Sequence, residues 1–156
     1  PITAKRQEER PYLLLYARRY NAKMSAYAEK IAAENGLEII EISLWAENAG
    51  KHRMFYEAGV EEFLSLVKCA ECVVTNSYHG MIFSIQFRRP FFVFSREQCS
   101  SKIAELLELL GLSDRLMLTG REQSKLEINF EAVHAVIQRE RERSMRFLSE
   151  ILSDIG

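Results

Sequence analysis

The feature that most constrains this chain is a strand–helix–strand unit near its start. The apolar run YLLLYA follows Pro11 and has charged residues on both sides. After it, Met24, Tyr27 and Ile31 recur at helical spacing, and Gly36 follows as a helix stop. The isoleucine-rich LEIIEISLW, residues 37–45, has the composition of a second strand. Such a unit normally forms a parallel pair with a right-handed crossover, so an open parallel α/β sheet is predicted.

The same alternation continues along the chain. The expected elements are a loop at 46–58, a helix at 60–67, a strand at 71–75, a helix at 81–87, a strand at 90–94 and an edge strand at 115–118. The helix MIFSIQF is apolar nearly all round, so burial on most sides is expected. A further helix capped by Ser100 or Ser101 should end at Gly111. The sequence therefore predicts a Rossmann-like open parallel sheet of four to five strands with helices on both faces.

The C-terminal segment differs from the rest. Two apolar groups, one within residues 130–137 and one within 147–152, flank QRERERS, which has no apolar residue. This pattern indicates a long helix, or two, that touches protein at both ends and water in the middle. We therefore divide the chain into a polar linker at 1–10, a Rossmann-like domain at 11–138 and a C-terminal helix at 139–156.

Composition and charge exclude several classes of function. A formal net charge of −1 gives no overall basic field for nucleic acid, and no apolar run approaches the ~18 residues of a membrane span. Cys69 and Cys72 form a lone CAEC without the second ligand pair that zinc would need, so we interpret them as two small apolar side chains. Sparse cysteines suit a reducing compartment, so a cytoplasmic protein is expected, with peripheral attachment at the inner face of the membrane left open. No metal or cofactor is expected.

The stretch TNSYHG, residues 75–80, is the candidate site. It falls between a predicted strand and an apolar helix, at the edge of the sheet where parallel α/β folds bind ligands. The first turn of a helix has unpaired N–H groups and a dipole that favours anions. Asn76 or Ser77 can cap this helix, Gly80 permits close approach to a ligand, and His79 can move a proton. The alternative is a structural, buried histidine beside a tight turn.

A longer stretch resembles a known family. GVEEFLSLVKCAECVVTNSYHGMIFSIQFRRPFFVF, followed by SSKIAELLELLGLSDRLM, resembles the C-terminal half of the polysaccharide pyruvyl transferases, with Ser77, His79 and Gly80 in the Ser-x-His-Gly motif. The resemblance extends over residues 11–119. It implies one half of a two-domain, GT-B-like enzyme that transfers pyruvate from phosphoenolpyruvate to sugar hydroxyls as a ketal, in cell-surface or exopolysaccharide biosynthesis.

The resemblance also implies roles for individual residues. His79 would be catalytic, and the residues expected to bind substrate are Asn76, Ser77, Gly80, Lys102, Arg18 and Arg96. Lys102 stands where family members often have arginine, so the charge is kept but the planar fork for a carboxylate is lost. Exposed surface arginine is the simpler interpretation of Arg18 and Arg96.

The expected partners are phosphoenolpyruvate, a sugar or glycan acceptor, and an N-terminal half of the same protein that this sequence lacks. Without that half the chain is expected to be inactive. Two roles of the C-terminal helix at 139–156 are left open: it crosses to the N-terminal half, or it forms a homodimer. Two other functions remain open. One is a glycosyltransferase domain that binds a nucleotide sugar, and the other is a non-catalytic binding module with the same fold.

Overall fold

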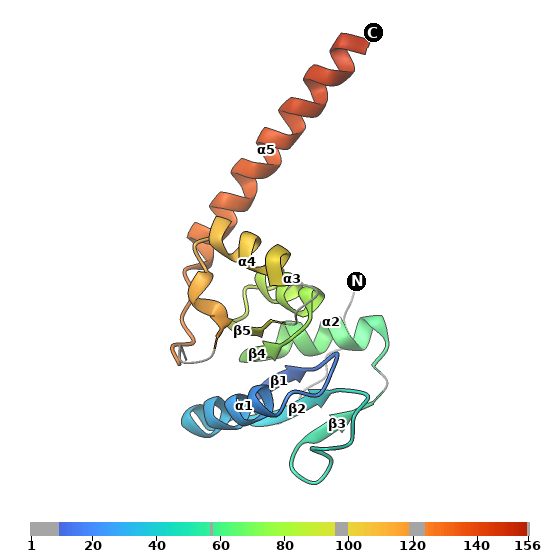
Figure 1. Ribbon diagram of the computed structural model, residues 1–156, viewed down its shortest axis with the longest axis vertical. Helices are drawn as coiled ribbons and strands as arrows, with labels where there is room; N and C mark the ends of the chain where they lie inside the picture. The colour runs from blue at the N-terminus through green and yellow to red at the C-terminus, as the bar shows by residue number, and fades with distance from the viewer. Residues whose placement is uncertain (1–9, 57, 96–99, 119–123, 156) are drawn as a thin grey trace.

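A computed structural model describes residues 10–56, 58–95, 100–118 and 124–155. Its centre is a six-stranded parallel sheet in the order β3-β2-β1-β4-β5-β6 (Figure 1). The strands are β1 (Tyr12–Tyr16), β2 (Glu38–Ile42), β3 (Arg53–Phe55), β4 (Cys72–Thr75), β5 (Phe91–Phe94) and β6 (Leu116–Met117). The predicted fold class is confirmed, with six strands in place of four to five.

Helices cover both faces of the sheet. They are α1 (Ala22–Asn35), α2 (Val60–Cys69), α3 (Tyr78–Gln86), α4 (Ser100–Leu109) and α5 (Phe130–Ile155). Alternate residues of a strand point to opposite faces. Accordingly Leu13 and Leu15 lie in the core beneath α1, whereas Leu14 and Val73 lie in the core shared with α2, α3 and α4. Gly36 ends α1 in the left-handed conformation, as its position in the sequence predicts.

The structure corrects four details of the sequence-based prediction. The expected loop at 46–58 contains β3, which pairs parallel with β2, and the long strand expected at 37–45 ends at Ile42. As a three-residue edge strand with no buried residue, β3 gives no periodic signal. Helix α3 begins at Tyr78, three residues before the expected start, and it is less enclosed than expected, because Gln86 is exposed and Ile82 only partly buried.

A buried polar cluster holds the connection between β2 and β3 against α1. The Glu41 carboxylate accepts a hydrogen bond from Asn48 Nδ2 at 2.9 Å and lies 2.6 Å from Nδ1 of His52. Asn48 Nδ2 also donates to Ser25 of α1 at 3.1 Å. On the other side of the ring, His52 Nε2 lies 3.3 Å from the Glu29 carboxylate. These contacts hold the connection after β2 against α1, on the face of the sheet opposite to α3.

Helix α5 is one continuous helix whose two ends have different surroundings. In its first turns Val133 is buried and Val136 packs against the core beside α3 and α4. The remainder projects away from the domain (Figure 1), and its large apolar side chains are exposed. One continuous helix is thus observed where the sequence indicates one long helix or two, and protein contact at its distal end stays a prediction. Among the described residues, no helix is both long enough and apolar enough to cross a bilayer.

Candidate functional site

The stretch 75–80 lies at the switch point of the sheet. β1 and β4 are adjacent and parallel, with Tyr16 opposite Thr75. From β1 the chain continues to α1 on one face, and from β4 it continues to α3 on the other. The two connections therefore diverge at the carboxyl edge, which is where open α/β sheets of this strand order bind their ligands.

Asn76 joins the two connections across this switch point. Its Oδ1 accepts a hydrogen bond from the Arg18 backbone N–H at 2.8 Å, and its Nδ2 donates to the Arg19 carbonyl at 2.8 Å. The side chain is buried, and both ends of its amide are used. The observed role of Asn76 is thus to position the loop after β1; a direct contact with substrate stays a prediction. The contact joins residues 58 positions apart, so no local pattern in the sequence could reveal it.

The first turn of α3 packs very closely on the end of β4. A Cβ atom at Gly80 would lie 2.6 Å from Thr75 Oγ1 and 3.0 Å from a ring carbon of Tyr16. Thr75 Oγ1 cannot easily move, because it donates to the Tyr16 carbonyl at 2.8 Å and accepts from the Ser77 N–H at 3.0 Å. The close approach seen at Gly80 is therefore between α3 and β4, and contact with a ligand stays a prediction.

Ser77 is the N-cap of α3, one of the two caps that the sequence suggests. Its hydroxyl accepts from the Gly80 N–H, at a long 3.5 Å, and its backbone is extended as caps require. Within the described part of the chain, the N–H groups of Tyr78 and His79 donate to no acceptor. The helix therefore presents two N–H groups and the positive end of its dipole at this edge.

His79 is exposed, unlike the buried histidine of the structural alternative. Its ring contacts that of Tyr78 edge-on, with 6.2 Å between the centroids. No other described residue forms a hydrogen bond or ion pair with the His79 ring. An imidazole that is not held by the protein is free to bind a ligand or to transfer a proton, so the arrangement suits an anion whose chemistry needs acid catalysis.

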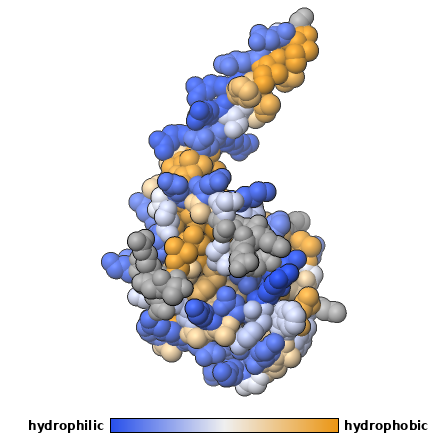
Figure 2. Space-filling model, viewed as in Figure 1, coloured by the Kyte–Doolittle hydropathy of each residue, from blue (hydrophilic) through white to orange (hydrophobic). Residues whose placement is uncertain are grey.

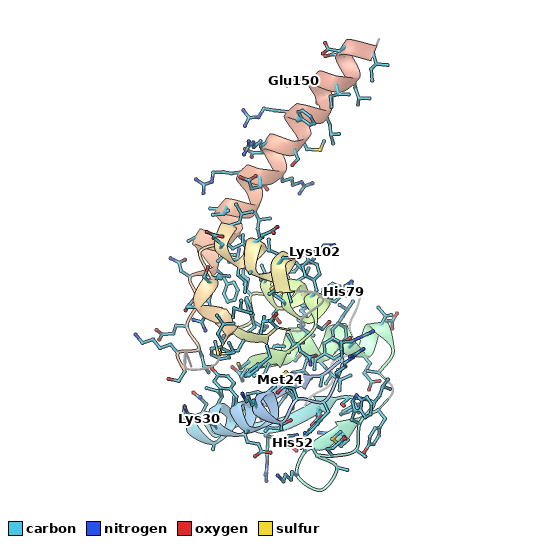
Figure 3. All side chains as sticks on the ribbon, in the orientation of Figure 1. Met24, Lys30, His52, His79, Lys102 and Glu150 are labelled. Atoms are coloured by element: carbon cyan, nitrogen blue, oxygen red, sulfur yellow. The ribbon has the colours of Figure 1, made fainter. Side chains whose placement is uncertain are left out.

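Two of the predicted cationic residues, Arg18 and Lys102, lie at the same edge of the sheet. Arg18 is exposed in the loop after β1, which Asn76 ties to the start of α3. Lys102 is exposed in the first turn of α4, and Figure 3 shows it on the same side of the molecule as His79. In a parallel sheet all helices after strands begin at one edge, which explains this placement. Arg96 lies outside the described residues.

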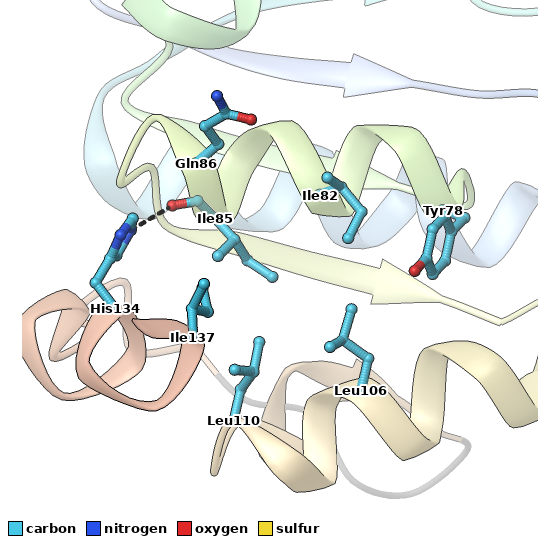
Figure 4. Close-up of a pocket in the computed structure, with 8 residues that line it drawn as sticks. All are labelled: Tyr78, Ile82, Ile85, Gln86, Leu106, Leu110, His134 and Ile137. Carbon is cyan, nitrogen blue, oxygen red and sulfur yellow. Dashed lines mark hydrogen bonds between the residues drawn. The ribbon is translucent and has the colours of Figure 1, made fainter. Parts of the chain in front are cut away.

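An apolar groove of about 470 Å³ lies behind the first turn of α3, between α3, α4 and α5 (Figure 4). Tyr78 stands at one end of the groove, beside His79, and Ile82, Leu106, Leu110 and Ile137 line its walls. At the other end the His134 ring of α5 donates from Nε2 to the Ile85 carbonyl at 3.0 Å. Since this bond reaches the last turn of α3, the groove connects the candidate site to the base of α5.

Cys69 and Cys72 lie away from this edge. Cys69 ends α2 and is exposed, whereas Cys72 begins β4 and is buried. Burial raises the pKa of the Cys72 thiol from 9.0 to about 12, against a smaller lowering by Arg115. Among the described residues, no group of three or more His, Cys, Asp or Glu side chains could hold a metal ion.

The sheet order and the diverging connections at its switch point define an open, doubly wound α/β domain. The model of one family, polysaccharide pyruvyl transferase, matches residues 1–98. The chain belongs to this family. The matched part includes Asn76, Ser77, His79 and Gly80 but ends before Lys102 and α4. No curated protein matches the sequence.

Proposed function

We propose that this domain binds phosphoenolpyruvate and forms the donor side of a polysaccharide pyruvyl transferase. The observation that carries the proposal is the first turn of α3, where two N–H groups without acceptors among the described residues adjoin the exposed His79. Such a turn favours phosphate or carboxylate, and phosphoenolpyruvate has both. Arg18 and Lys102 supply further positive charge at the carboxyl edge of the sheet.

In the proposed reaction, phosphoenolpyruvate and two sugar hydroxyls give a pyruvate ketal and inorganic phosphate. The methylene carbon gains one proton, the C–O bond to phosphate breaks, and two bonds form from the central carbon to sugar oxygens. The two hydroxyl protons balance the proton on the new methyl group and the proton on the phosphate. His79 delivers the proton to the methylene carbon or stabilises the departing phosphate. An N-terminal half of the same protein forms the opposite wall of the site, against which the sugar acceptor binds.

Binding can be tested on this domain by NMR, with the His79 ring as reporter. Phosphoenolpyruvate should shift the His79 ring signals and the amide signals of residues 78–80 in a saturable manner. His79→Asn should weaken the binding. Lys102→Ala, as a separate variant, should also weaken it, because a positive charge is lost. Lys68→Ala, an exposed lysine at the end of α2 on the opposite edge, is the matched control and should have no effect.

The competing functions predict different titrations. Saturable binding of a nucleotide sugar without phosphoenolpyruvate would favour a glycosyltransferase domain, and binding of neither would favour a non-catalytic module. In an intact transferase, His79→Asn should lower turnover by ~100-fold or more with nearly unchanged thermal stability. A collapse of stability instead would restore the structural interpretation of His79.

A further inference from the structure

The distal part of α5 is an apolar surface without a partner in the described chain. Six large apolar side chains there are between 40% and 77% exposed: Met145, Phe147, Leu148, Ile151, Leu152 and Ile155. Figure 2 shows them gathered along one flank of the projecting helix. Monomeric soluble proteins rarely expose a contiguous patch of this kind, so such a patch generally marks an interaction site.

The same face of α5 that rests on the domain becomes this exposed surface further along. Steps of three and four residues lead from His134 and Ile137, which line the groove, through Arg141 and Ser144 to Leu148, Ile151 and Ile155. Alternating steps of three and four residues are the heptad spacing of a helix seam that packs on another helix. The polar seam positions Arg141 and Ser144 separate the intramolecular contact from the free apolar part.

This geometry disfavours a flat membrane surface as the partner. The domain itself lies on the side of α5 to which the seam points, because His134 and Ile137 contact α3 and α4 there (Figure 4). A plane laid along the distal seam would meet the body of the domain. A slender partner that runs alongside the projecting helix, such as another helix, avoids this collision.

The charges of the projecting helix favour its own copy in the opposite direction. Residues 139–146 contain four arginines and two glutamates, whereas residues 147–155 contain Glu150 and Asp154 and no basic residue. Antiparallel pairing places the positive half of one helix beside the negative half of the other. Parallel pairing would place like charges together and align the two helix dipoles unfavourably.

We propose that the distal part of α5 is a dimerisation surface on which α5 of a second copy packs antiparallel, centred near Leu148. In this register Leu148 faces its own copy, Ile151 faces Met145, and Ile155 lies level with Arg141. The partner helix therefore ends before Ile137, where α5 meets its own domain. Each domain keeps its contact with the first turns of its own α5, and the pairing does not depend on what the site at α3 binds.

Light scattering across a concentration series of the 156-residue chain tests the pairing. We expect a dimer for the wild type and a monomer for the double variant Leu148→Glu, Ile151→Glu. The matched control is Ser149→Glu, Ser153→Glu, which adds the same charge to exposed polar positions off the seam and should remain dimeric. A chain that ends at Gln138 should be monomeric. Circular dichroism and phosphoenolpyruvate titration verify that each variant keeps its fold and its site.

Cysteine cross-linking tests the direction of the pair. Leu148→Cys should form a disulfide between copies on oxidation. Ser144→Cys should not, because antiparallel copies of this position lie about 12 Å apart along the helix. The wild type serves as the background for the exposed Cys69. Efficient cross-linking through Ser144→Cys would overturn the antiparallel arrangement.

Two further results would overturn the proposal as a whole. One is a monomer at the highest concentration of the series. In that case the distal apolar face of α5 would have another partner, such as a lipid surface or another domain of the same protein. The other is equal loss of the dimer in the seam variant and in the control variant.

Discussion

At the scale of single residues, the Ser-x-His-Gly stretch combines closely packed residues with one exposed imidazole. Gly80 and Thr75 set the distance between α3 and β4, and Ser77 caps the helix. The neighbouring His79 makes no comparable contact and is exposed. The tight packing of Gly80 therefore fixes where the exposed imidazole stands, although Gly80 and His79 have opposite surroundings.

Gly80→Ala should lower the free energy of unfolding by about 1–3 kcal/mol, because the added methyl group overpacks the joint between α3 and β4. Its nearest neighbour would be Thr75 Oγ1 at 2.6 Å, which is held by two hydrogen bonds. Urea unfolding measures the change. Gly50→Ala, at a glycine where an added Cβ meets nothing within 4 Å, is the matched control and should be nearly neutral. A Gly80→Ala protein as stable as the control would contradict this account of the joint.

At the scale of elements, the sequence predicts the strands and helices with strong periodicity and misses the contacts between them. β1, α1, α2, α4 and α5 all follow from their apolar spacing. β3 does not, because none of its three residues is buried and the strand is held by its pairing with β2. The position of the Ser-x-His-Gly motif was likewise predictable. The tie between Asn76 and the loop after β1 was not, since it depends on the adjacency of β1 and β4.

The polar cluster of Glu41, Asn48 and His52 was missed for a related reason. Glu41 lies within the apolar strand EIIEI, and a charged residue at an inward position is a signal that a partner must exist. The sequence does not say which residue that partner is. Asn48 and His52 come from the connection that the pattern assigned to a loop.

Asn76→Ala should loosen the loop after β1 by removing both hydrogen bonds that hold it. We expect a loss of about 1–3 kcal/mol in the free energy of unfolding and faster amide hydrogen exchange at Arg18. Asn35→Ala removes a side-chain bond to the Ile31 carbonyl at the far end of α1 and is the matched control. It should leave exchange at Arg18 unchanged. Unaltered exchange at Arg18 in Asn76→Ala would show that other contacts position this loop.

At the scale of the whole molecule, the buried thiol of Cys72 links stability to pH. Burial raises its pKa from 9.0 to about 12, so the unfolded chain loses this proton first as the pH rises. The stabilisation from the neutral, buried thiol is complete below pH 9 and is lost between pH 9 and about 12. Each pH unit within that window costs about 1.4 kcal/mol.

Urea unfolding between pH 8.5 and 10.5 tests this dependence. Cys72→Ala should lower stability at every pH, because a buried side chain is shortened, but its stability should fall less steeply with pH than that of the wild type. Cys69→Ala, at the exposed cysteine, should keep the wild-type slope. Equal slopes in all three proteins would mean that Cys72 ionises as readily in the folded chain as in the unfolded one.

The central position of β1 has a consequence for the order in which the sheet can be completed. One neighbour of β1, β2, is close in the sequence, but the other, β4, begins only at Cys72. Until β4 arrives, one edge of β1 has a row of unpaired backbone donors and acceptors along the apolar residues Leu13, Leu14 and Leu15. Bare apolar edges recruit strands from other chains. Any interruption of synthesis or any cleavage before residue 72 would therefore leave a fragment that aggregates rather than one that folds to half of the domain.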